Sequence, residues 1–237
     1  MHRSPVTAAL VICVSVAFAP WALAEMGPCQ PDKFDGLTCG SGVGAARVIA
    51  DTLSPSKRLA LAWRSPKGPP TEIPSGDTEI LVVRVADGAI LATSTGTYWN
   101  TGESRANRLD ESATWSPNSR LLIRSFDSRF STDNIDLYSF GANDEATGPV
   151  DLLKLIEPAV RAHLKRRVKD EQKYVLSIAN DPAMSVGNGG LVRARVMMSV
   201  PKEDPERDYN VTVRVMLGAK PLAARIVAVV PARAVAR

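Results

Sequence analysis

The stretch that decides the fold is ESATWSPNSRLLIRSFDS, residues 111–128, in which a short polar turn lies between two segments with strand character. Pro117 fixes φ at the first central position of a tight turn, and Asn118 suits the next position, where a short polar side chain bonds locally. The apolar run that leaves the turn predicts a strand. Whether this turn belongs to a single hairpin or to a repeat decides which architecture to expect.

A similar pattern lies upstream, where DTLSPSKRLALAW from Asp51 aligns with ATWSPNSRLLIRS from Ala113. Both have an apolar residue, Ser-Pro, two polar residues, Arg and an apolar run. Residues 78–88 then correspond to residues 133–144 as a second strand and a polar turn, and the first copy carries a Pro- and Gly-rich insert at residues 65–76. Two unrelated hairpins are the alternative, because Ser-Pro turns are common. The repeat predicts four buried residues in the strands after the turns: Leu59, Leu61, Leu121 and Ile123.

This pattern resembles the blade repeat of TolB-type β-propellers, which reads W-S-P-D-G-(K/R), then an apolar strand, then an I-x-x-x-D strand. Two features depart from the family. Its Asp-Gly turn is replaced by Asn118-Ser119 in one copy and by Ser56-Lys57 in the other. The copies also cover only about residues 51–140, whereas a closed propeller typically takes about 4–8 four-stranded blades.

The resemblance implies one four-stranded blade and part of a second. The strands of the first blade are expected at residues 58–64, 79–85, 89–95 and 112–115. The second is expected to begin after the second turn and to break off after Phe140. Propellers of this kind act as interaction platforms, so the resemblance also implies a binding role.

The character of the chain changes after Phe140, where residues 141–149 have the composition of a linker. Apolar residues at helical spacing over residues 151–170 predict a helix, which Pro158 either begins or kinks. Four strands are predicted beyond it, in the runs KYVLSIA, GLVRARVMMSV, YNVTVRVML and LAARIVAVV. Alternation in the second and third runs places these residues on the buried faces: Val192, Ala194, Val196, Met198, Val200, Tyr209, Val211, Val213, Val215 and Leu217.

The predicted fold class is therefore β-rich α+β, with a propeller-blade-like antiparallel sheet followed by a helix packed on a four-stranded antiparallel meander. The expected parts are a disulfide loop with a Gly-rich connector at residues 25–50, the blade-like region at 51–140, the helix and meander at 150–231, and a tail at 232–237. A blade and a half leaves an open sheet edge. That edge must be covered by the chain or paired in a homodimer.

The N-terminus has the features of a secretory signal peptide over residues 1–24. Arg3 gives a positive start, residues 6–18 are apolar, and Ala-Leu-Ala precedes Glu25. No later apolar run approaches the roughly 20 residues of a membrane helix. We therefore expect an exported, soluble protein without a membrane span, either periplasmic or secreted.

Export changes how the cysteines are interpreted. Cys13 would leave with the signal peptide, so the mature chain would keep Cys29 and Cys39, an even pair in an oxidising compartment. A disulfide across this short polar loop is predicted to stabilise the fold by about 2–3 kcal/mol. Gly40, Gly42 and Gly44 follow the loop and not a strand of a βαβ unit, which favours a connector over a nucleotide site.

The residues needed for several familiar chemistries are missing. His163 is the one histidine after the signal peptide and no G-x-S-x-G motif occurs, so neither a serine triad nor a common zinc site is expected, and no cofactor is predicted. Asp127, Asp133 and Asp136 lie close together in sequence and offer a calcium site as one interpretation and a polar hairpin loop as the favoured one. Folding can still bring two distant carboxylates together.

A basic cluster, Lys165, Arg166, Arg167 and Lys169, lies near the end of the predicted helix. Cations there complement the helix dipole on an exposed surface, and contact with an anionic partner such as lipid headgroups or an acidic protein is the alternative. The net charge of +4 is scattered along the chain, which gives no nucleic-acid signature.

Two functions remain in view. The favoured hypothesis is an exported, non-catalytic binding or envelope-assembly module whose partner is an envelope protein or an anionic surface. The alternative is a hydrolase that acts on an envelope substrate through carboxylates. A deep pocket with several acids of raised pKa would favour the hydrolase, and a flat surface with an exposed edge would favour the binding module.

Overall fold

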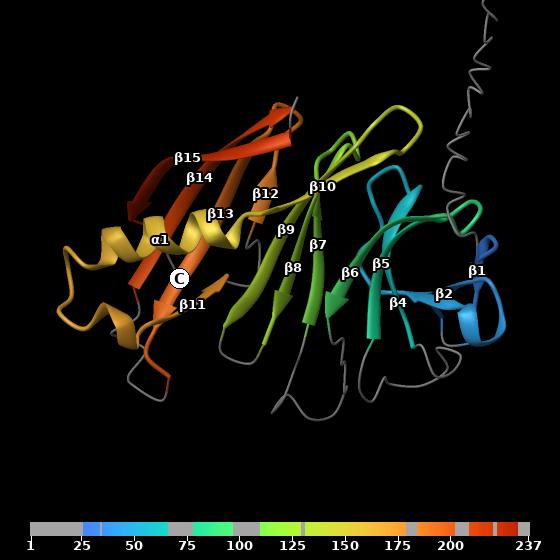
Figure 1. Ribbon diagram of the computed structural model, residues 1–237, viewed down its shortest axis with the longest axis horizontal. Helices are drawn as coiled ribbons and strands as arrows, with labels where there is room; N and C mark the ends of the chain where they lie inside the picture. The colour runs from blue at the N-terminus through green and yellow to red at the C-terminus, as the bar shows by residue number, and fades with distance from the viewer. Residues whose placement is uncertain are drawn as a thin grey trace, which may run out of the picture.

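The computed structural model describes residues 26–33, 35–65, 78–96, 110–128, 131–178, 184–201, 209–219 and 222–231. The predicted signal peptide and the C-terminal tail lie outside these residues. The described chain forms three antiparallel sheets and one α-helix, which follow one another along the long axis of the molecule (Figure 1). The β-rich α+β prediction is confirmed. Within these residues the sheets close into neither a barrel nor a propeller.

The first sheet has six strands in sequence order, and its first hairpin carries the disulfide. Cys29 and Cys39 lie directly opposite each other in the register of the first two strands and are bonded, as predicted. The glycine-rich segment after Cys39 includes a short 3₁₀ turn, Gly42–Gly44, which leads into the third strand. The strands are β1 (Cys29–Pro31), β2 (Leu37–Cys39), β3 (Ala46–Val48), β4 (Leu59–Arg64), β5 (Thr78–Arg84) and β6 (Ile90–Gly96).

The second sheet has four strands in the order β10-β9-β8-β7: β7 (Asp110–Trp115), β8 (Leu121–Asp127), β9 (Thr132–Phe140) and β10 (Ala146–Asp151). Two predictions were wrong here. Residues 112–115 belong to this sheet and not to the first, because the tight turn after Trp115 pairs β7 with β8; β3 takes the fourth place beside β4 instead. The end of the predicted linker, residues 146–149, belongs to β10, an edge strand that tolerates Pro149 at a register shift.

The two predicted turns have the same conformation. Lys57 and Ser119 both have positive φ, at 58° and 59°. Each turn is closed by an N–H that donates to a serine carbonyl at 2.8 Å, from Lys57 to Ser54 and from Ser119 to Ser116. The serine hydroxyl then accepts the N–H of the first strand residue, at 3.1 Å for Leu59 and 2.9 Å for Leu121. The aligned segments are therefore equivalent in structure as well as in sequence.

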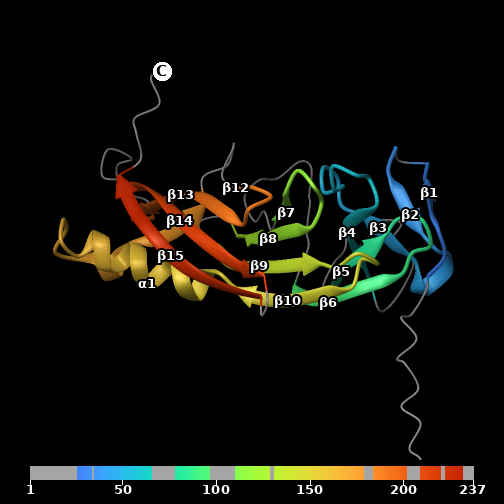
Figure 2. The same cartoon turned by 90° about the horizontal axis from the view of Figure 1, so that it is seen from above.

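The third sheet contains the four predicted strands of the meander, and a short fifth strand, β12, pairs with β13. Its strands are β11 (Val175–Ile178), β12 (Met184–Val186), β13 (Leu191–Ser199), β14 (Tyr209–Ala219) and β15 (Leu222–Pro231). The helix α1 (Leu153–Leu164) lies across one side of this sheet (Figures 1 and 2) and buries Ile156, Val160 and Leu164 against it. Pro158 lies inside the helix and does not begin it.

The second sheet is covered on both faces, and this explains its burial pattern. On β8, Leu122 packs with Leu59 and Leu61 of the first sheet, whereas Ile123 packs with α1 and the third sheet. The predicted burial is correct for Leu59, Leu61 and Ile123, which are fully buried. Leu121 is only half-buried, because it lies at the start of β8, at the rim of the core.

Candidate functional site

Polar contacts between the two equivalent turns join the first sheet to the second. The N–H of Ser56 donates to Ser119 Oγ at 3.0 Å, and Trp115 Nε1 donates to the carbonyl of Thr52 at 2.9 Å. Arg58 of the first copy pairs with Asp144 at 2.9 Å, beyond the second strand of the second copy. These contacts fix how the two sheets stack.

A buried charge cluster lies in the same interface. We define it as Glu111 on β7, Arg124 on β8 and Asp136 on β9. Arg124 Nε and Nη2 donate to the two carboxylate oxygens of Glu111 at 2.8 and 2.5 Å. Its Nη1 donates to Asp136 Oδ2 at 2.8 Å and to Ser94 Oγ of β6, in the first sheet, at 2.6 Å. One guanidinium thus connects three strands of the second sheet to the first.

Strand alternation explains why these side chains meet. Asp136 is the direct cross-strand partner of Arg124. The apolar residues at the same parity on the three strands point toward the first sheet and pack in its core: Ala113, Trp115, Leu122, Tyr138 and Phe140. The charged residues therefore continue an apolar face. Sequence reasoning considered Asp136 only as part of a loop and missed Glu111 and Arg124. The available signal was that each of the three strands has a charged residue at a position where alternation points the side chain toward the core.

Burial controls the protonation of the cluster. The side chains of Glu111, Arg124 and Asp136 are 0, 1 and 7% exposed. Desolvation raises the pKa of Glu111 from 4.5 to about 7, although the hydrogen bonds and charge of Arg124 lower it. Desolvation also raises the pKa of Asp136, although the charge and hydrogen bond of Arg124 lower it. One cation faces two acids, so a proton held on the cluster relieves a net negative charge.

A carboxyl group with a raised pKa suits general acid–base catalysis, but the group must also be accessible to a substrate. Both acids are sealed between two sheets and both are bonded to the same guanidinium. A substrate would have to separate the first sheet from the second to reach them. In this closed arrangement, the cluster can hold the first and second sheets together.

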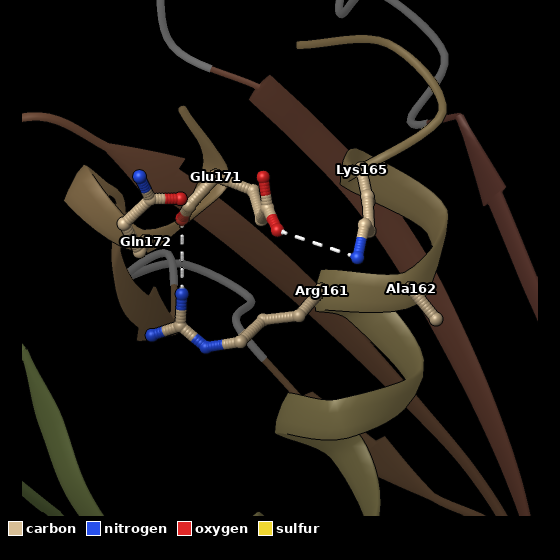
Figure 3. A pocket seen from close by; sticks show the side chains of 5 residues that line it. All are labelled: Arg161, Ala162, Lys165, Glu171 and Gln172. Carbon is tan, nitrogen blue, oxygen red and sulfur yellow. Dashed lines mark hydrogen bonds and ion pairs between the residues drawn. The ribbon is translucent and has the colours of Figure 1, made fainter. Parts of the chain in front are cut away.

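A pocket lies elsewhere, between α1 and the short 3₁₀ turn η3 (Glu171–Lys173). It has a volume of about 310 Å³ and is lined by Arg161, Ala162, Lys165, Glu171 and Gln172 (Figure 3). Arg161 Nη1 donates to the carbonyls of Glu171 and Tyr174 at 3.1 and 3.2 Å. Arg161 therefore fastens the segment after the helix.

The predicted basic cluster lies at the end of α1, and Lys165, Arg166, Arg167 and Lys169 are all exposed. Lys165 Nζ lies 4.0 Å from Glu171 Oε1. The other three form no ion pair within the described part of the chain. This placement suits cations that complement the helix dipole, and an anionic partner of these residues stays a prediction.

The three aspartates considered for calcium have different partners. Thr132 Oγ1 donates to Asp127, Ser131 Oγ donates to Asp133 at 2.6 Å, and Asp136 belongs to the charge cluster. No group of three or more His, Cys, Asp or Glu side chains among the described residues could hold a metal ion.

His163 lies beside the hydrophobic core. Its ring centroid is 6.0 Å from that of Tyr209, and its buried Nε2 has no hydrogen-bond partner among the described residues. No serine or carboxylate bonds to it in the described structure.

Comparison with protein-family models, curated proteins and solved structures finds no match to this chain. None of the described helices is both long and apolar enough to span a membrane. The function must therefore be argued from the residues of the chain itself.

Proposed function

We propose that this protein is an exported, non-catalytic binding or assembly module of the cell envelope. The observation that carries the proposal is the use of the buried acids. Glu111 and Asp136, the two acids whose pKa burial raises, are both bonded to Arg124 in the interface of two sheets. Carboxyl groups committed to a structural contact are not free to act on a substrate.

Export is supported by the sequence of residues 1–24 and is consistent with the Cys29–Cys39 disulfide. The resemblance of the two turns to propeller blades adds support for binding by analogy only, since one fold can host many activities.

One observation favours a hydrolase as the second candidate. A carboxyl group with a pKa of about 7, as Glu111 has, is suited to general acid–base catalysis near neutral pH. This function requires that the interface of the first two sheets open to admit a substrate.

A turnover screen with matched variants separates the two functions. Processed wild-type protein is tested on envelope glycans, peptides and esters beside Glu111→Gln, Asp136→Asn and the exposed control Asp133→Asn, with thermal melting as the check on folding. We expect no turnover above a mock preparation for any of them. Turnover by the wild type that Asp133→Asn retains and folded Glu111→Gln loses would establish the hydrolase instead.

A further inference from the structure

The third sheet has one covered side and one exposed side. The covered side consists of the predicted alternating residues, which pack against α1 and the second sheet. Val200 is the exception, because it lies beyond the end of β13 and is only half-buried. The helix lies on that side only (Figures 1 and 2). The side chains of opposite parity point away from the core. We call this exposed side the outer face.

Four arginines from three neighbouring strands lie on the outer face. Arg193 and Arg195 come from β13, Arg214 from β14, and Arg225 from β15. The register places Arg193 directly opposite Arg214, and Arg225 opposite Met216, two residues further along β14. Arg195 is half-buried and the other three are exposed.

These arginines have no counter-charge in the described structure. The five strands of the third sheet contain no aspartate or glutamate. None of the four guanidiniums forms an ion pair with a described residue. Two like charges directly opposite each other on a sheet destabilise it. A repulsive pair with no acid among the described residues of the sheet presents positive charge that an external anion can neutralise.

The spacing suits phosphate groups. Directly opposite residues have Cβ atoms about 5 Å apart, so the guanidiniums of Arg193 and Arg214 can converge on one phosphate. Arg195 follows Arg193 by two residues, about 7 Å along the strand. The face therefore presents several cations close enough together to contact neighbouring phosphate groups.

The other residues of the outer face decide between anionic partners. Leu191, Met197 and Met216 lie among the arginines, and Val227 on β15 is 50% exposed. Arginines interspersed with apolar side chains on a broad surface are typical of contact with a membrane interface, where the cations reach the headgroups and the apolar groups reach the acyl boundary. The one aromatic residue of these strands, Tyr209, packs toward the core, so the face offers no ring on which a nucleic-acid base could stack. A second copy of the same face would be repelled.

We propose that the outer face of the third sheet binds the anionic surface of a lipid bilayer through the phosphate groups of its headgroups. The envelope location comes from the proposed function, on which this inference rests. The proposal assigns the anionic contact to Arg193, Arg195, Arg214 and Arg225, and not to the basic cluster at the end of α1.

The test uses vesicles and two charge-matched variants. Protein processed by an exporting host is sedimented with phosphatidylcholine vesicles, with and without phosphatidylglycerol. Arg193→Gln/Arg214→Gln removes two arginines from the outer face, and Arg166→Gln/Arg167→Gln removes two exposed arginines from the end of α1. Circular dichroism and thermal melting confirm that both variants fold.

We expect binding only to vesicles with phosphatidylglycerol, and weaker binding as salt is added. Each arginine near an anionic surface contributes about fivefold to partitioning, so the outer-face variant should bind about tenfold or more weakly, whereas the helix variant should stay within about twofold of the wild type. Equal losses in the two variants would overturn the proposal, because they would indicate net charge alone. Equal binding to neutral vesicles would overturn it too. So would a protein that binds no vesicles but binds an acidic protein or a single-stranded oligonucleotide. Absence of vesicle binding would leave the non-catalytic function intact, since turnover decides that question.

Discussion

Arg124 lies where three strands and two sheets meet, and its removal would leave two carboxyl groups buried without a cation. A buried ion cluster adds little net stability compared with apolar residues that pack well, but breaking it is costly. The cluster therefore has a testable signature at the scale of single residues. The effect of replacing one member on the free energy of unfolding should depend strongly on whether the other two members are present.

Arg124→Met is expected to lower the free energy of unfolding by about 3–5 kcal/mol, because it leaves Glu111 and Asp136 buried without a cation. The triple variant Glu111→Leu/Arg124→Met/Asp136→Leu should recover most of this loss, because no charge is left unpaired. Urea denaturation at neutral pH measures both. A small effect of Arg124→Met, or a triple variant that is less stable than the single one, would show that the cluster does not brace the sheets.

The raised pKa of Glu111 also predicts how stability depends on pH. Its folded pKa of about 7 lies above its ordinary value of 4.5, so the folded state holds a proton that the unfolded state has lost between these values. Stability should therefore fall as the pH rises from about 4.5 to about 7, by up to about 3 kcal/mol, and this contribution should level off above pH 7. Asp136, whose pKa is also raised, acts in the same direction.

Chemical denaturation across this pH range measures the slope, and Glu111→Gln is the matched control because it cannot ionise. The slope should be shallower in that variant. A wild-type profile that rises with pH through this window would contradict the assignment.

At the scale of elements, the sequence predicted local structure well and neighbour relations less well. Alternation identified the inner faces of β13 and β14, because residues on one face of a strand repeat every two positions. It could not assign β7 to a sheet, since a strand between two sheets satisfies the same pattern in either. The stretch around Pro149 was interpreted as a linker because its composition is that of a turn, although an edge strand tolerates it.

The charge cluster escaped prediction for a related reason. Glu111, Arg124 and Asp136 come together only when the register of three strands is known. Likewise, the outer face depends on strand pairing that places Arg193 opposite Arg214.

Two residues on the same face of β8 test how the second sheet packs against the third. Ile123 is fully buried between the second and third sheets, whereas Leu121 is half-buried at the rim. Ile123→Ala should therefore cost about 2–5 kcal/mol in unfolding free energy, and Leu121→Ala should cost clearly less. Thermal melting of the pair gives the comparison. A larger loss for Leu121→Ala would mean that Leu121, and not Ile123, lies deeper in the core between the second and third sheets.

At the scale of the whole molecule, the three sheets are joined by two interfaces of different kinds. The first contains the charge cluster and the polar turn contacts, and the second is an apolar core shared with α1. In the described structure the outer face of the third sheet is exposed, and its four arginines form no ion pair with a described residue. A binding module needs one such exposed surface on a firmly held scaffold.

Export is the premise of this account and has its own test. N-terminal sequencing of protein recovered from the exporting cell should begin at or near Glu25, because Ala-Leu-Ala precedes it. Stable, folded protein that retains Met1 would contradict export through this signal.

The most direct test of binding through the outer face is photo-cross-linking in the exporting cell, with a photoreactive residue at Val227 or, as a control, at Val43. Both valines are exposed, at 50 and 59%, and they lie on the third and first sheet regions, at opposite ends of the described chain. Mass spectrometry of the products should find lipid adducts at Val227 and few or none at Val43. Equal labelling at the two positions, or adducts at Val43 alone, would contradict the claim that this protein works by binding through the outer face of its third sheet.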